Sequence, residues 1–129
     1  MILVGLDGSN ASFAALDFAI EEAKIRKTKV VAIHSLYGGD RTKSEDVAKG
    51  EEILEEARRR GEKAGVEVET HLLVRGNEPG YDIISYADEI NASLIVVGVR
   101  RRSAVGKLIL GSVAQYVILN AKQPVVSVK

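Results

Sequence analysis

The chain has 129 residues, which is enough for one domain with a hydrophobic core and too few for two domains of ordinary size. Lys+Arg and Asp+Glu both number 18, so net charge gives no general affinity for nucleic acids or anionic membranes, and any anion site has to be local. The sequence contains no cysteine, which excludes disulfides, thiol catalysis and cysteine-based metal sites.

Two features of the sequence indicate where the protein works. No apolar run approaches the roughly 18 residues of a membrane span. The first residues, MILVGLDGS, lack the basic start of a signal peptide. We therefore expect a single domain over residues 1–129, located in the cytoplasm, with no membrane or nucleic-acid partner.

The first element in chain order is a short apolar run over residues 2–6, which predicts a strand. It breaks at the turn residues Asp7, Gly8 and Ser9. The apolar residues of the next segment share one face at helical spacing: Phe13, Leu16, Ile20 and Ala23. Residues 30–35 are rich in β-branched side chains and predict a second strand.

A long helix and an edge strand are predicted next. Thr42 and Glu45 have the spacing of a capping box at the start of the helix. Gly50 and Gly61 fall on its inward face and indicate a close approach of the backbone to its neighbours. Residues 66–74 then alternate between apolar and more polar side chains, which favours a strand toward the edge of the sheet.

The second half of the chain repeats this alternation. A helix places four apolar residues inward: Ile83, Ile84, Ala87 and Ile90. An apolar strand over residues 94–97 ends at Gly98, and after a loop Ser112 is a candidate N-cap for a last helix. Residues 124–128 predict a fifth strand, with Pro124 at its first position.

Strands that alternate with helices at this spacing predict a parallel, doubly wound α/β sheet with right-handed crossovers and helices on both faces. Ligands of such sheets sit beyond the carboxyl ends of the strands, where the strand order reverses. The breaks after the first strand, at residues 7–9, and after the fourth strand, at Gly98, are the two candidates for that crevice.

The loop between Gly98 and Ser112 has the chemistry of an anion site. It carries three adjacent arginines at 100–102 and then Lys107, and it ends at Gly111 before the helical pattern begins. Guanidinium groups pair with phosphate oxygens, glycines allow close approach of the backbone, and a helix N-terminus presents unpaired amide donors. The loop therefore predicts a site for an anion, most simply a phosphate.

This loop resembles that of the universal stress protein family, whose nucleotide-binding members carry Gly, two residues, Gly, nine residues, Gly and then Ser or Thr. Gly98 fits the first position, and Gly111 and Ser112 fit the last pair. Arg101 stands where the second glycine would be. The resemblance extends to both ends of the chain and covers essentially its whole length.

The resemblance implies a Rossmann-like fold of the adenine nucleotide alpha hydrolase type, with five parallel strands in the order 3-2-1-4-5. It also implies a stress-response protein that binds ATP, with or without Mg²⁺, and that forms a homodimer through the last strand, Pro124 to Val128. The residues expected at the nucleotide are Asp7, Gly8, Ser9, Ala32, His34, Ser35, Gly98, Val99, Arg100, Arg101, Gly111, Ser112 and Val113.

Several of these residues also have purely structural explanations. Asp7 can cap the first helix or make a turn with Ser9, and Gly98 can serve a simple strand-to-loop turn. The guanidinium group of Arg101 can bind the phosphates in place of the backbone contacts of the missing glycine. Alternatively, the Arg101 side chain can fill the space that the phosphates need.

A second hypothesis is a dimeric interaction module that binds no nucleotide and whose arginine loop binds a protein or another anion. On that hypothesis, replacing Arg101 by Gly would create ATP binding. A third hypothesis is an enzyme, such as a slow ATPase, but the sequence offers no evident general base for catalysis. His34 and His71 have no third ligand at a metal-binding spacing, so we predict no metal site on the protein itself.

Overall fold

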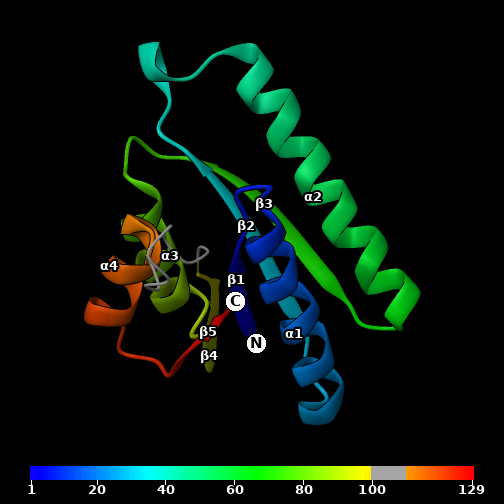
Figure 1. Cartoon of the computed structure of the whole chain (residues 1–129). Helices are drawn as coiled ribbons and strands as arrows, with labels where there is room; N and C mark the ends of the chain where they lie inside the picture. The colour runs from blue at the N-terminus through cyan, green and yellow to red at the C-terminus, as the bar shows by residue number, and fades with distance from the viewer. Residues whose placement is uncertain (100–109) are drawn as a thin grey trace, which may run out of the picture.

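The computed structural model describes residues 1–99 and 110–129, which form a five-stranded parallel sheet with helices on both faces (Figure 1). The strand order is β3-β2-β1-β4-β5, which confirms the predicted order and the doubly wound α/β class. The elements are β1 (Ile2–Gly5), α1 (Asn10–Arg26), β2 (Val30–Leu36), η1 (Gly39–Arg41), α2 (Ser44–Ala64), β3 (Val68–Val74), α3 (Pro79–Glu89), β4 (Leu94–Gly98), α4 (Ser112–Asn120) and β5 (Val125–Val128).

The central strands are buried on both faces of the sheet. In β1, the side chains of Ile2, Leu3 and Val4 are 0% exposed. Helices α1 and α2 pack on one face and α3 and α4 on the other (Figure 1). Because strand side chains alternate, Ile2 and Val4 belong to the core under α1 and α2, and Leu3 belongs to the core under α3 and α4. Burial on both sides explains the unbroken apolar run that predicted this strand.

The direction in which the chain adds strands reverses at β1. Ile2 pairs with Val30 of β2 on one side and with Leu94 of β4 on the other. All these pairings are parallel, so the carboxyl ends of β1 and β4 open side by side at the same edge of the sheet. The two breaks that the sequence suggested as candidates for a crevice are therefore neighbours.

The start of α2 differs from the prediction. Its N-cap is Lys43, whose backbone amide donates to the Asp46 carboxylate at 2.8 Å. The Thr42 hydroxyl accepts instead from the amide of Gly38 at 2.8 Å. The predicted capping box of Thr42 with Glu45 is thus wrong by one residue, because the preceding turn already engages the Thr42 side chain.

The inward glycines of α2 have the predicted role. A side chain at Gly61 would collide with Val68 of β3, and one at Gly50 would collide with the ring of His34. The helix can lie against the sheet only because both positions lack a Cβ. The strand that follows α2, β3, is an edge of the sheet as expected.

Each helix in the described part of the chain is too short or too polar to cross a lipid bilayer. Within residues 1–99 and 110–129, none combines the length and the apolar character that a membrane crossing requires.

Candidate functional site

A pocket lies beyond the carboxyl ends of β1, β2 and β4, where the strand order reverses. It encloses about 780 Å³ of space between atoms, part of which is open to solvent. The described lining residues come from these strand ends and from the starts of α1, α3 and α4: Gly5, Leu6, Asp7, Ser9, Ala11, Ser12, Ile33, His34, Ser35, Pro79, Ile83, Val97, Gly98, Gly111, Ser112, Val113 and Ala114. This is the place in a doubly wound sheet where ligands bind.

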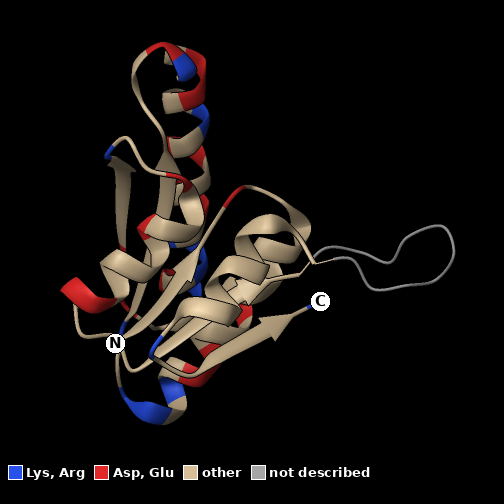
Figure 2. Ribbon diagram, turned by 90° about the vertical axis from the view of Figure 1, so that its left-hand side faces the viewer, with Lys and Arg blue, Asp and Glu red and all other residues tan. Residues whose placement is uncertain are grey.

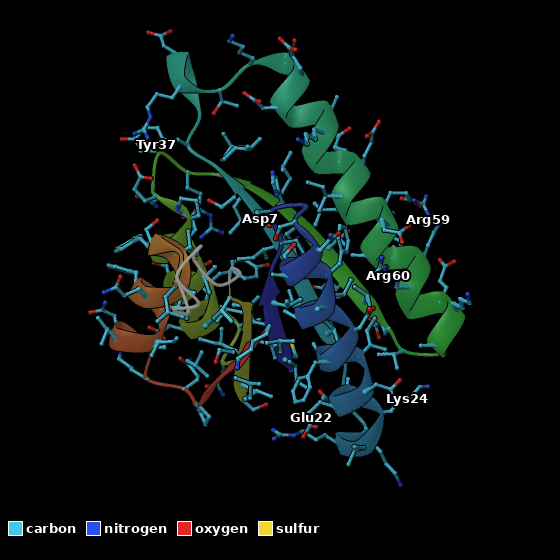
Figure 3. The ribbon with its side chains drawn as sticks, viewed as in Figure 1. Asp7, Glu22, Lys24, Tyr37, Arg59 and Arg60 are labelled. Carbon is cyan, nitrogen blue, oxygen red and sulfur yellow. The ribbon has the colours of Figure 1, made fainter. Side chains whose placement is uncertain are left out.

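The turn between β1 and α1 forms the middle of the pocket. Figure 3 shows Asp7 at the end of β1, beside the start of α1. The amide of Ser9 donates to Asp7 Oδ1 at 2.8 Å, and Ser9 caps α1 by accepting from the amide of Ser12 at 3.1 Å. Asp7 therefore makes the turn with Ser9 that the sequence offered as a structural explanation. A carboxylate accepts several hydrogen bonds, so this turn is compatible with a ligand contact.

Gly98 sets the distance between β4 and α1. A Cβ at this position would lie 2.5 Å from the carbonyl carbon of Ala11 and 2.8 Å from the amide nitrogen of Ser12. These are backbone atoms, which cannot rotate out of the way as the end of a side chain can. Gly98 is therefore needed for the first turn of α1 to pass over the end of β4, in addition to lining the pocket.

The N-terminus of α4 faces the pocket. Its N-cap is Gly111, whose carbonyl accepts from the amide of Gln115 at 3.0 Å. The prediction of Ser112 as N-cap is therefore wrong: Ser112 is the first helical residue, because Gly111 has the extended backbone of a cap. Among the residues that the structure describes, no side chain makes a capping hydrogen bond to this end. The first amides of a helix have no partner inside it and carry partial positive charge, so this end suits an anion.

The end of β2 contributes two polar side chains that point to opposite faces of the sheet. His34 Nδ1 donates to the carbonyl of Leu6 at 2.7 Å, and Gly50 of α2 leaves room for the imidazole ring. Ser35 lies on the side of α3 and donates from Oγ to Asp82 Oδ2 at 2.5 Å. Both side chains line the pocket, and their contact with a nucleotide stays a prediction.

Asp82 is a polar residue of the site that the sequence reasoning missed. Its side chain is 0% exposed, and its second carboxylate oxygen accepts from Asn77 Nδ2 at 3.2 Å. The available signal was its position in the helix: Asp82 falls on the same inward face as Ile83 and Tyr86. An acid in an inward apolar stripe requires buried partners, and that requirement points to a polar neighbour on the sheet.

Three predicted contact residues do not line the pocket in the described part of the chain. Gly8 forms the turn with a φ of 87°. Ala32 lies one step down the same face of β2 from His34, and it is 0% exposed within the core under α1 and α2. Val99 is 3% exposed and belongs to the opposite core. The predictions for Arg100 and Arg101 lie outside the described residues.

The potential metal ligands do not gather in one place in the part of the chain that the structure describes. Within residues 1–99 and 110–129, no group of three or more His, Cys, Asp or Glu side chains is arranged to hold a metal ion.

Together, the fold and the pocket define a doubly wound α/β protein with a ligand site at the switch point of its sheet. Residues 1–129 match the model of the universal stress protein family over the whole chain. The chain belongs to the universal stress protein family.

Solved structures place the chain close to individual members. It is 50% identical to a universal stress protein from Archaeoglobus fulgidus, with a TM-score of 0.94 over 99% of this chain and 97% of that one. A universal stress protein from the same organism in complex with dAMP is 45% identical, with a TM-score of 0.87 over 99% and 96%. A universal stress protein in complex with cAMP is 30% identical, with a TM-score of 0.78 over 98% and 94%.

Proposed function

We propose that this protein binds an adenine nucleotide, with ATP as the leading case, in the pocket beyond β1, β2 and β4. The observation that carries the proposal is the shape of the site: it joins the N-terminus of α4 to the end of β2, across β1. The dAMP and cAMP complexes of similar universal stress proteins support it. Both of those ligands carry one phosphate, so the triphosphate is the further step in this proposal.

The two ends of the pocket differ chemically, which sets the orientation of the nucleotide. The phosphates lie at Gly111, Ser112 and Val113, where amide donors and the helix dipole attract negative charge. The base lies toward β2, where Ile33 and Ile83 supply an apolar wall. The ribose then falls between them, within reach of the Asp7 carboxylate.

Mg²⁺ fits this arrangement as an ion that arrives with the phosphates. Mg²⁺ keeps several waters and binds through one or two carboxylates together with substrate phosphates. Asp7 is the acidic residue among the described lining residues. A Mg²⁺ ion held by the phosphates and this one carboxylate needs no group of three or more protein ligands.

Binding rather than turnover is the proposed activity. A ligand that binds only the folded state at 100 times its dissociation constant adds about 2.7 kcal/mol to the free energy of unfolding. A cytoplasmic stress-response protein can use such a gain, or the change in surface that accompanies it, to report nucleotide levels.

Calorimetric titration of nucleotide-stripped protein with AMP, ATP and Mg-ATP tests the proposal. We expect saturable binding and a rise in melting temperature with each bound ligand. Absence of both heat and thermal stabilisation at millimolar nucleotide would contradict nucleotide binding. Binding of AMP but not of ATP would contradict only the triphosphate.

Ser112→Asp tests the phosphate end of the site. The new carboxylate meets the phosphates directly, so we expect ATP binding to weaken by at least about tenfold. An acid in the first turn also complements the helix dipole, by about 0.3–1 kcal/mol, so the fold should lose no stability. The matched control is Ser44→Asp, the same change at the first residue of α2, which does not line the pocket. Equal ATP affinities of the two variants would count against phosphates at α4.

We also propose that two copies associate through β5. β5 is an edge strand, and the residues of β5 and α4 include no charged side chain. In Figure 2 the strand that leads to the C-terminus is tan, whereas charged residues of both signs follow one another along other elements. On α4, Leu119 is 72% exposed. An uncharged, β-branched strand with a free edge favours pairing with a second copy.

A further inference from the structure

Asp82 stands directly behind the wall of the pocket. The carboxylate is fully buried, and each of its oxygens has one donor: Ser35 Oγ at 2.5 Å and Asn77 Nδ2 at 3.2 Å. Of these residues, only Ser35 lines the pocket. Burying an acid is costly unless donors surround it, so the three side chains form a unit that reaches the pocket through the Ser35 hydroxyl.

The hydrogen bond to Asp82 fixes the direction of the Ser35 hydroxyl proton. A serine hydroxyl has one proton and two lone pairs, whereas an ionised carboxylate can only accept. Ser35 therefore donates its proton to Asp82, in a charge-assisted bond whose oxygen–oxygen distance is 2.5 Å. Only lone pairs remain for the pocket, so Ser35 can accept a hydrogen bond from a ligand but cannot donate one.

His34 has a similar restriction. A carbonyl oxygen can only accept, so the 2.7 Å contact with Leu6 places the ring proton on Nδ1. The neutral imidazole then carries a lone pair, not a proton, on Nε2. While His34 is neutral, neither polar side chain at the end of β2 offers a proton to a ligand on these atoms.

We propose that Asp82, acting through Ser35, makes the base end of the pocket selective for purines with an amino group at C6 over purines with a carbonyl there. This selectivity rests on the proposed nucleotide binding. An adenine amino group supplies the donor that Ser35 lacks. Hypoxanthine and guanine instead carry a carbonyl oxygen at C6, whose lone pairs would face the lone pairs of Ser35 Oγ. No hydrogen bond can form between two acceptors, so the carbonyl oxygen would be buried without a partner. Ser35 is the specificity-determining residue, and Asp82 is a positioning residue.

Because of Asn77, one substitution of equal size can reverse the direction of the hydrogen bond between residue 82 and Ser35. In Asp82→Asn, the new side-chain oxygen keeps the hydrogen bond from Asn77, which turns the new NH₂ group toward Ser35 Oγ. Ser35 then accepts a hydrogen bond from this amide instead of donating one to a carboxylate, and its proton is free to turn to the pocket. The variant should therefore gain affinity for a carbonyl at C6 and lose affinity for an amino group.

The experiment compares binding of AMP and IMP, which share ribose and phosphate, to four proteins by calorimetry. The parent should favour AMP over IMP by at least about tenfold, as expected when a buried hydrogen bond is lost. Asp82→Asn should move that ratio toward IMP by at least about tenfold. Ser35→Ala should bring it closer to one. Asp88→Asn, the same change on the exposed side of α3, is the matched control and should leave the ratio unchanged.

A third ligand separates the amino group from the rest of the base. Purine riboside 5′-monophosphate has hydrogen at C6 and should bind the parent between AMP and IMP. If neither AMP nor IMP binds the parent, both the proposed nucleotide site and the proposed selectivity are contradicted. If AMP binds the parent, but a folded Asp82→Asn protein keeps the parent's ratio of AMP to IMP, the selectivity alone is overturned and the nucleotide site stands.

Discussion

Gly98 shows how one residue can serve both the fold and the site. The sequence singled it out as the end of a buried strand and the start of a possible phosphate loop. The structure adds a reason that lies elsewhere in the chain, because the backbone of Ala11 and Ser12 passes directly over it. The glycine is thus required even in the absence of any ligand.

Gly98→Ala should destabilise the protein. The new Cβ meets backbone atoms of α1, so helix or strand has to shift, at a cost of about 1–3 kcal/mol in the free energy of unfolding measured in urea. Gly5→Ala is the comparison, because its Cβ would meet the end of the Ile83 side chain, which can rotate away. A Gly98→Ala variant no less stable than Gly5→Ala would contradict the close approach.

Residues of the site were predictable to the extent that they follow strand ends. Asp7, Ser9, His34 and Ser35 were found in this way and do line the pocket. Asp82 was not found, because its partner Ser35 lies 47 residues away in the sequence. No local pattern indicates which strand an inward acid on a helix will face.

At the scale of elements, β3 shows how an edge strand is held by charge as well as by packing. Glu69 accepts from His71 Nε2 at 2.6 Å and from Lys29 Nζ at 2.7 Å. These hydrogen bonds, first from His71 and then from Lys29, hold the pKa of Glu69 below its usual range. The cluster ties β3 to the turn before β2 on a partly exposed face of the sheet.

This cluster predicts a dependence of stability on pH. Because the pKa of Glu69 is lowered by folding, its contribution is fully present above the usual pKa of a glutamate and is lost as the pH falls through the lowered value. Glu69→Gln should therefore destabilise the protein more at pH 7 than near pH 3. The loss should stay below about 1 kcal/mol, because the groups are partly exposed.

Urea unfolding at both pH values measures this effect. Glu62→Gln is the control, since Glu62 is exposed on α2, away from Lys29 and His71. A destabilisation by Glu69→Gln that was the same at pH 3 and pH 7 would mean that the charge of Glu69 is not its source.

The start of α4 marks the limit of reading elements from sequence. Helical spacing predicted the helix correctly, but the choice between Gly111 and Ser112 as N-cap depended on the backbone of one residue. A cap is decided by φ and ψ at the helix boundary, and serine is also acceptable in the first turn. The difference matters here, because the Ser112 side chain belongs to the first turn and lines the pocket instead of capping the helix.

At the scale of the whole molecule, the proposed dimer depends on the outward edge of β5. In this strand the carbonyls of Pro124 and Val128 accept from amides of β4 or the residue after it. In a parallel strand the N–H and C=O groups of one residue point to the same side, and those of the next residue point to the other side. Val128 faces β4, so the N–H group of its neighbour Ser127 points away from β4.

Ser127→Pro should therefore convert a dimer into a monomer. The substitution removes an outward amide and leaves the bonds to β4 in place, and proline is tolerated on an edge strand. Sedimentation measures the change in mass, and Ser127→Ala is the control that alters the side chain but keeps the amide. A Ser127→Pro protein that still sediments as a dimer would exclude pairing through this edge.

The sequence by itself determined the alternation of strands and helices, the double burial of the central strands and the two breaks that open into the pocket. These are local properties, since periodicity and turn residues act over a few positions. Only the tertiary structure decided that Gly98 lies under α1, that Ala32 belongs to the core, and that Asp82 reaches Ser35. Such contacts join residues far apart in the chain, and they exist only once the helices have packed on the sheet.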